Sequence, residues 1–402
     1  MTSQNDVLEK MLKKLEKIET KLDRMDDTIA QNSQSIESLK TGVVQRVVRF
    51  GTTDVGNACG VVSMGHNELI GESGPRQNES EARRAARRER QRFGARLFST
   101  YCAFFAVLMA ISWMDLLPVF EWEVMEFDLA ERVSVWLRDN MHMPFIISLV
   151  YIIVIFSIQR FMKNRDEFDL RKPLAAWSLL LGGFSLAGSI RTVPVLFKLL
   201  QEKGVFHLLC GDTRRDWVID NPAGVWTMFF IFSKVPELID TLFIVLRKRK
   251  LITLHWYHHI TVMTFCWHSW ATFCLNGLVY SSMNLTVHAF MYVFYALTAL
   301  GYRPTEFAMY ITILQILQMV VGTAVTVFVN YHIRFVVYQE PSISLKTSWD
   351  ALSMDLNTDP SCKVHTLNAF AGLAMYASYL WLFCVFFYVS YVRPKPQKEK
   401  SN

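Results

Sequence analysis

Long apolar runs alternate with short charged stretches through most of the chain. A helix rises about 1.5 Å per residue, so it needs about 20 residues to cross the roughly 30 Å hydrocarbon core of a bilayer. Runs of that length cover residues 143–161, 174–198, 224–246, 254–275, 278–300, 306–331 and 366–392. The pattern predicts an all-α polytopic membrane protein, with a transmembrane domain over 121–392 that contains seven spanning helices.

An eighth apolar run covers residues 97–120 and contains a single charged residue, Asp115. It is long enough to cross the membrane, and we predict an extra N-terminal span there. An internal signal sequence, or a helix that lies against the bundle, stays open as the alternative.

Basic residues indicate the orientation, because Lys and Arg next to spans tend to stay cytosolic. They collect after the first, third and fifth of the seven runs and at the end of the chain, at Arg160, Lys163, Arg165, Arg171, Lys172, Arg247–Lys250, Arg303, Arg393, Lys395, Lys398 and Lys400. The alternation predicts a cytosolic C-terminus. The Arg-rich run 83–90 before the extra span places the N-terminus in the cytosol too.

The N-terminal region has a different pattern. Apolar residues repeat every seven positions over 1–40, at Leu8, Leu15, Leu22, Ile29 and Ile36, with Met11, Ile18, Met25, Asn32 and Leu39 three residues on. Such a heptad predicts a coiled coil and favours a homo-oligomer, although a helix that docks on its own domain is the alternative. Residues 41–96 are polar and Arg-rich, which predicts a basic flexible linker.

Composition agrees with the membrane class. Of 402 residues, 51% are apolar and 19% are charged, which is less charge than ordinary soluble domains have. We expect no nucleic-acid partner. Cysteines are few, but Cys210 and Cys362 both fall in loops on the predicted lumenal side, so we predict a disulfide between them.

Polar side chains occur inside four consecutive predicted spans. A central charge costs about 2.5–3.5 kcal/mol on insertion scales, so such residues usually face the bundle interior and have a function. They are Lys234, Glu237, Asp240 and Thr241; His255, His258 and His259; Asn284, His288, Tyr292 and Tyr295; and Thr312, Gln315 and Gln318. Helical spacing puts most members of each set on one stripe, at depths of roughly 6–18 Å from the cytosolic side. The four sets can therefore converge on one site.

Three interpretations of the histidines compete. Histidines in spans can simply form hydrogen bonds between helices. Three histidines within five residues are more than such a structural role explains. A di-iron desaturase or hydroxylase also uses HxxHH boxes. It needs more histidines than this chain offers, because five of the ten lie outside the cytosolic half, at His66, His142, His207, His332 and His365. Acid–base or nucleophilic catalysis fits best, since imidazole titrates near neutrality and is a good nucleophile when neutral.

The motifs resemble those of the ELO family of very-long-chain fatty acid elongases. KxxExxDT begins at Lys234, HxxHH at His255, NxxxHxxMYxYY at Asn284 and TxxQxxQ at Thr312. The chain departs from the third motif at Phe294, where a tyrosine is usual. The resemblance covers residues 120–402, and the stretches 171–178 and 254–262 look most like the branch that acts on saturated and monounsaturated chains near sixteen carbons.

The resemblance implies seven helices, six of them around a narrow tunnel, and a condensation of acyl-CoA with malonyl-CoA that needs no cofactor. It implies an endoplasmic reticulum membrane, where other enzymes of the elongation cycle are expected partners. The tail 393–402 fits, because Lys398 and Lys400 form a dilysine-type signal.

Roles follow from the same resemblance and from chemistry. We expect His258 to be the nucleophile, with His255 and His259 orienting or deprotonating it, and Cys266 as the alternative acyl acceptor. We expect His288 and Asn284 to support decarboxylation and enolate charge. The remaining residues are expected to bind substrate or hold the site, with cations for CoA phosphates: Lys234, Arg247, Lys248, Glu237, Asp240, Tyr292, Tyr295, Gln315 and Gln318.

Overall fold

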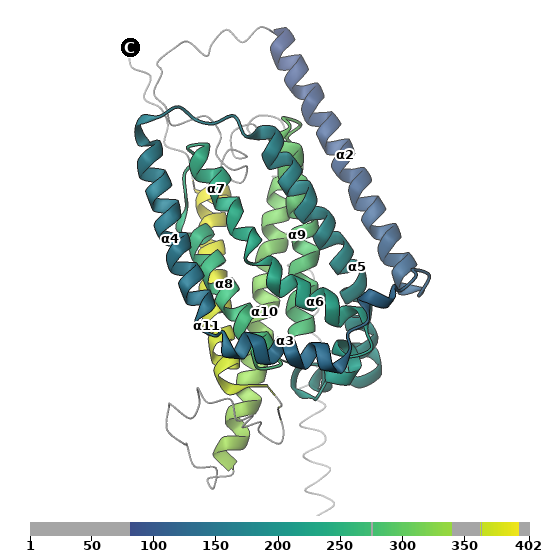
Figure 1. The fold of residues 1–402 in the computed structure, drawn as a ribbon. Coiled ribbons are helices and arrows are strands. Elements are labelled where there is room, and N and C mark those ends of the chain that lie inside the picture. The colour runs from purple at the N-terminus through teal and green to yellow at the C-terminus, as the bar shows by residue number, and fades with distance from the viewer. Residues whose placement is uncertain (1–80, 275, 340–361, 363, 394–402) are drawn as a thin grey trace, which may run out of the picture. The chain divides into compact units, whose positions relative to one another are not determined.

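The structure is a computed structural model that describes residues 81–274, 276–339, 362 and 364–393 (Figure 1). All regular secondary structure within these residues is helical, so the predicted all-α class is confirmed. The predicted coiled coil over 1–40, the predicted linker up to residue 80 and the tail 394–402 lie outside the described residues.

Five stretches are long and apolar enough to cross a membrane: Ala85–Trp113, Met143–Asn164, Arg171–Cys210, Thr305–Ile333 and Thr366–Val392. Their outward faces are apolar as well. On α4 (Met143–Phe161), for example, Phe145, Leu149 and Ile153 are each more than half exposed, as expected of side chains that face lipid. The chain is therefore a multi-pass membrane protein.

The extra N-terminal run forms α2 (Glu81–Trp113), which differs from the prediction at both ends. It begins inside the predicted linker, because residues 81–96 are mostly Ala, Glu, Gln and Arg, which are good helix formers. It ends before residue 120, since Asp115 has a positive φ of 54° and Pro118 disfavours a helical residue before it.

A short helix, α3 (Phe127–Asp139), connects α2 to α4 and lies across one end of the bundle (Figure 1). Ser134 Oγ donates a hydrogen bond to the carbonyl of Ala271, and Trp267 Nε1 donates one to the carbonyl of Leu137. These bonds fix α3 to α8 (Thr253–Ala271).

The predicted span 224–246 is broken into two helices, α6 (Pro222–Ser233) and α7 (Ile239–Leu246). A 3-10 turn, Pro236–Leu238, joins them. Pro236 causes the break, because it has no N–H for a helical hydrogen bond and its ring clashes with the preceding turn. The break places several polar side chains near the middle of the protein.

Helix α5 (Arg171–Cys210), which is kinked at Gly204, packs along α9 (Gly277–Ala299). Small residues allow this close approach. A Cβ added at Gly188 would lie 2.9 Å from Leu285 Cδ1, so a larger residue there would force the Leu285 side chain to move. The bundle is completed by α10 (Thr305–Gln339) and α11 (Thr366–Phe387).

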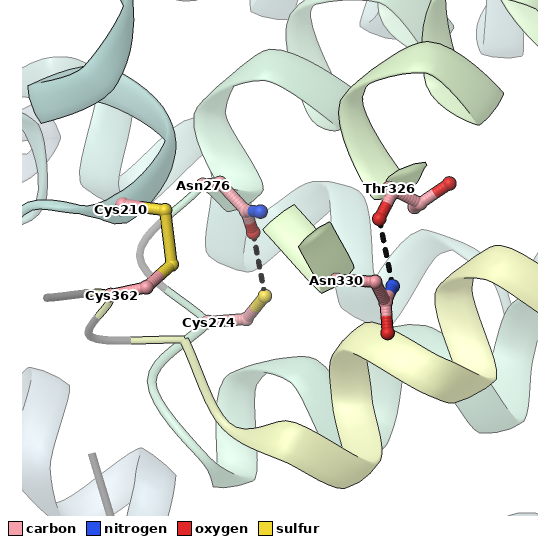
Figure 2. The surroundings of a disulfide bond; sticks show 6 residues. All are labelled: Cys210, Cys274, Asn276, Thr326, Asn330 and Cys362. Atoms are coloured by element: carbon pink, nitrogen blue, oxygen red, sulfur yellow. Dashed lines mark hydrogen bonds between the residues drawn. A yellow bond between two sulfur atoms is a disulfide. The ribbon is translucent and has the colours of Figure 1, made fainter. Parts of the chain in front are cut away.

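Cys210, the last residue of α5, forms a disulfide with Cys362, just before α11 (Figure 2). The bond joins residues 152 positions apart in the chain, and Cys362 is fully buried. The predicted pairing is confirmed. Nearby, Asn330 Nδ2 donates to the carbonyls of Thr326 and Ala369, which links α10 to α11.

Candidate functional site

The helix break between α6 and α7 holds a buried ion pair. Lys234 Nζ lies 2.7 Å from Glu237 Oε1 and 3.0 Å from Oε2, and the two residues are 2% and 3% exposed. Ser233 Oγ donates a further hydrogen bond to Glu237 Oε1 at 2.8 Å. A buried charge needs such partners, because an isolated one would be strongly disfavoured. Lys234 therefore points into the bundle.

The same lysine links this break to α9. Lys234 Nζ donates to Asn284 Oδ1 at 3.2 Å, and Asn284 Nδ2 lies 3.3 Å from His288 Nε2. All three side chains are buried. The first and third sequence motifs thus meet in one continuous chain of polar contacts, Glu237–Lys234–Asn284–His288.

A second buried carboxylate, Asp240, has two aromatic donors. Trp177 Nε1 donates to Oδ1 at 2.6 Å, and Tyr292 OH donates to Oδ2 at 2.7 Å. Trp177 belongs to α5 and Tyr292 to α9. Asp240 therefore fixes α7 between two other helices and orients the Tyr292 ring, which lies edge-on to His288 with 5.3 Å between ring centroids.

His255, the first of the three clustered histidines, is oriented by α7 and α4. Its Nε2 lies 3.0 Å from Thr241 Oγ1, and Tyr151 OH lies 2.7 Å from the same oxygen. A hydroxyl both donates and accepts, so Thr241 can bond both neighbours at once. The polar chain Tyr151–Thr241–His255 links three helices.

His258 and His259 have different surroundings. His259 is buried, with its ring centroid 4.5 Å from that of His255 and its Nδ1 without a hydrogen-bond partner among the described residues. His258 keeps some accessible surface and packs against Tyr379 of α11, with ring centroids 4.9 Å apart. The two rings diverge around the helix as predicted. Of the pair, His258 is the more exposed.

The fourth motif lies further from these contacts. Gln315 Nε2 lies 3.2 Å from Met291 Sδ, while Thr312 Oγ1 lies 3.3 Å from Tyr391 OH. Gln318 is buried, and Tyr295 lies edge-on to Tyr292 at 6.3 Å. These residues line α9 and α10 beside the site and do not join its polar chains.

The basic loop between α7 and α8 contains the predicted phosphate-binding residues. Burial, and then the nearby cations Arg249 and Arg171, lower the pKa of Arg247, so a bound anion would relieve this repulsion. Lys248 has a positive φ of 52°, and its Nζ donates to the carbonyl of Arg165 at 2.8 Å. One of its three donors is therefore used within the protein.

Sequence reasoning missed three residues of the site: Tyr151, Trp177 and Tyr379. Tyr379 OH bonds Thr261 Oγ1 at 2.5 Å and donates to the carbonyl of His258 at 3.3 Å. Each is an aromatic residue with a polar atom inside an apolar run. That was the available signal in the sequence.

Metal binding gains no geometric support. Among the residues that the structure describes, no group of three or more His, Cys, Asp or Glu side chains is arranged to hold a metal ion. Cys266, the other candidate nucleophile, is buried in the apolar core with Trp267 and Val262.

The fold and the site together define an all-α, multi-pass membrane protein with a buried site of histidines, amides and paired charges. The family model described as ELO: GNS1/SUR4 family matches residues 136–399. The chain therefore belongs to the ELO family.

Individual relatives are likewise described as fatty acid elongases. A Drosophila melanogaster protein described as very long chain fatty acid elongase 6 is 39% identical over 271 residues, which are 67% of this chain and 78% of that protein. Its Homo sapiens counterpart by description is 37% identical over 291 residues, 72% of this chain and 99% of that protein. A Trypanosoma cruzi (strain CL Brener) protein described as fatty acid elongase 2 is 40% identical over 228 residues, which are 56% of this chain and 75% of that protein.

Proposed function

We propose that this protein is a very-long-chain 3-oxoacyl-CoA synthase, the condensing enzyme of fatty acid elongation. It joins a long-chain acyl-CoA to malonyl-CoA and releases CO2 and CoA. Membership of the ELO family and the elongase descriptions of its relatives support this reaction. The single observation that carries the proposal is the buried chain from Glu237 through Lys234 and Asn284 to His288, which combines residues of two motifs beside the histidine cluster.

In the first half of the proposed reaction, His258 attacks the thioester carbonyl. A bond forms between its ring nitrogen and the acyl carbon, and the bond from carbon to the CoA sulfur breaks. The proton on the other ring nitrogen passes, by way of His255 or His259, to the departing thiolate. Partial accessibility of His258 and the orienting contact of Tyr379 support this role.

In the second half, malonyl-CoA loses CO2, and the electron pair of the broken bond stays on the carbon next to the thioester as an enolate. Asn284 and His288 are placed to stabilise this charge with hydrogen bonds, and Lys234 orients Asn284. The enolate carbon attacks the acyl group, and the bond to His258 breaks. A proton from water restores neutral His258.

Substrate binding follows from the same arrangement. Arg247 would bind a CoA phosphate, because an anion relieves its repulsion with Arg249 and Arg171. The acyl chain would enter a tunnel among six helices, with Gln315, Gln318, Tyr292 and Tyr295 in its wall. We expect acyl chains near sixteen carbons, as the resemblance of the stretches 171–178 and 254–262 implies.

The proposed reaction takes place at a membrane. We expect the endoplasmic reticulum membrane, a cytosolic C-terminus and other enzymes of the elongation cycle as partners. No cofactor is required, since each step uses only the residues above and the two thioesters.

The test uses the full chain in lipid nanodiscs, with palmitoyl-CoA and malonyl-CoA labelled at the free carboxyl. We expect labelled CO2 to be released with one equivalent of a 3-oxoacyl-CoA two carbons longer, detected by mass spectrometry. Oxygen consumption with stoichiometric iron would support a desaturase or hydroxylase instead. Absence of labelled CO2 would contradict the proposal.

A further inference from the structure

Helix α2 precedes the region that the chain shares with its relatives. The family model begins at residue 136, whereas α2 covers Glu81–Trp113. The alignment with the human relative includes 99% of that protein and only 72% of this chain. The function proposed above assigns nothing to α2, although it packs against the bundle.

Backbone and side-chain contacts fix α2 at defined points. A Cβ at Gly94 would lie 2.3 Å from the carbonyl oxygen of Tyr302, so only glycine permits this approach to the turn between α9 and α10. Tyr101 OH donates to the carbonyl of Ala289 at 3.1 Å, and Ser112 Oγ donates to the carbonyl of Ile190 at 2.5 Å. These bonds set both the height and the rotation of α2.

Aromatic packing lies between these points. Phe98 is 3% exposed and lies edge-on to Phe294 of α9, with 6.3 Å between centroids, while Phe105 lies 4.6 Å from Phe290. Phe294 is the residue at which the chain departs from the family motif, and it is 1% exposed. A phenylalanine suits this apolar contact, because a buried hydroxyl would need a hydrogen-bond partner.

On α9, the residues that contact α2 alternate along the sequence with residues of the site. At 3.6 residues per turn, Phe290 points about 160° and Phe294 about 120° away from His288. One face of α9 therefore meets α2 while the other meets the site. Tyr292, which bonds Asp240, belongs to the same packed cluster as Phe98 and Phe294.

We propose that α2 is a positioning helix for the site. Phe98 and Tyr101 hold the segment Ala289–Leu297 of α9 at one height and rotation. This keeps His288 aligned with Asn284 and keeps Tyr292 on Asp240. The structural part of this proposal stands by itself, whereas its effect on turnover rests on the proposed condensation.

The test compares full-length variants in nanodiscs. Phe98→Ala removes the contact, Phe98→Leu partly restores apolar volume, and Tyr101→Phe removes only the hydrogen bond. Phe104→Ala is the matched control, because Phe104 lies on the same helix but is 52% exposed. Hydrogen exchange of the amides over 286–297 is measured together with kcat and KM for malonyl-CoA.

We expect faster exchange over 286–297 in Phe98→Ala and Tyr101→Phe, with recovery in Phe98→Leu and no change in Phe104→Ala. Because a shift of about 1 Å can cost on the order of a hundredfold in rate, kcat should fall at least about tenfold in Phe98→Ala, while KM changes little. Unchanged exchange and kcat, or equal changes in Phe104→Ala, would overturn the proposal. If Phe98→Ala does not fold, Tyr101→Phe decides. A wild-type protein without condensing activity would reject the proposed function, and the exchange comparison would still decide the role of α2.

Discussion

Lys234 and Asn284 are 50 positions apart in the chain, and Lys234 Nζ lies 3.2 Å from Asn284 Oδ1. This contact places the charge of the broken α6–α7 span against α9. It also explains why a lysine is tolerated at 2% exposure, since Glu237 neutralises it and Asn284 takes one of its three donors.

Breaking this pair from one side should destabilise the protein. Lys234→Met leaves Glu237 buried without its cation, and loss of one partner of a buried pair costs about 3–5 kcal/mol. The thermal midpoint in detergent should fall clearly. The double variant Lys234→Met/Glu237→Gln should recover most of the stability but not the CO2 release. Full activity of the double variant would show that the pair does not serve the reaction.

Thr241→Val should weaken catalysis without a large effect on folding. Valine has nearly the shape of threonine but cannot bond His255, so the imidazole loses its orienting partner. We expect kcat to fall about tenfold to a hundredfold. Thr264→Val is the control, because Thr264 Oγ1 bonds only the carbonyl of Ile260 in its own helix. Equal losses in both variants would reject the role of Thr241.

Glu123, which lies outside the spans, forms an ion pair with Arg191 of α5. Its Oε2 lies 2.6 Å from Arg191, and Trp226 Nε1 donates to Oε1. Burial by itself would raise the pKa of Glu123, but the hydrogen bonds from Arg191, Trp226 and the backbone of Phe120 outweigh it, so the net pKa is lowered.

The lowered pKa of Glu123 determines how its contribution to stability changes with pH. The stabilisation by the carboxylate is present above its unfolded pKa of about 4.3 and is lost as the pH falls through the lower folded value. Glu123→Gln should therefore lower the thermal midpoint equally at pH 7 and pH 5.5. The exposed neighbour gives the control Glu121→Gln, which should have no such effect. A deficit that disappears at pH 5.5 would contradict the assignment.

The disulfide provides a separate test of the fold. Replacing Cys210 and Cys362 together by alanine should cost about 2–5 kcal/mol of stability, because the bond closes a loop of 152 residues in the unfolded chain. Cys384→Ala removes an exposed free thiol and should leave the thermal midpoint unchanged. Non-reducing peptide mapping should find Cys210 and Cys362 in one linked peptide. Two free thiols would contradict the structure.

Much of the architecture could be predicted from hydrophobicity alone. The apolar run 143–161 coincides with α4, since no charged residue occurs in it before Arg160 near its end. The run 224–246 contained Pro236, yet its length and hydropathy gave no indication of a 3-10 turn. Helix α3 was missed because its 13 residues are too few to span and its apolar pattern is short.

Features of the site that depend on spacing along one helix could be predicted, whereas contacts between side chains of different helices could not. Helical spacing correctly separated the directions of His258 and His259. It could not assign Trp177 to Asp240 or Tyr151 to Thr241, because those contacts depend on how neighbouring helices rotate. For the same reason it could not show that the helix break turns Lys234 inward to Glu237.

Intact-mass spectrometry after incubation with palmitoyl-CoA alone tests the central claim, the nucleophilic role of His258, most directly. The wild-type protein should gain the mass of one palmitoyl group, and the adduct should disappear when malonyl-CoA is added. His258→Ala should show no adduct, while Cys266→Ala should retain it. An adduct that persists in His258→Ala and is lost in Cys266→Ala would contradict the account.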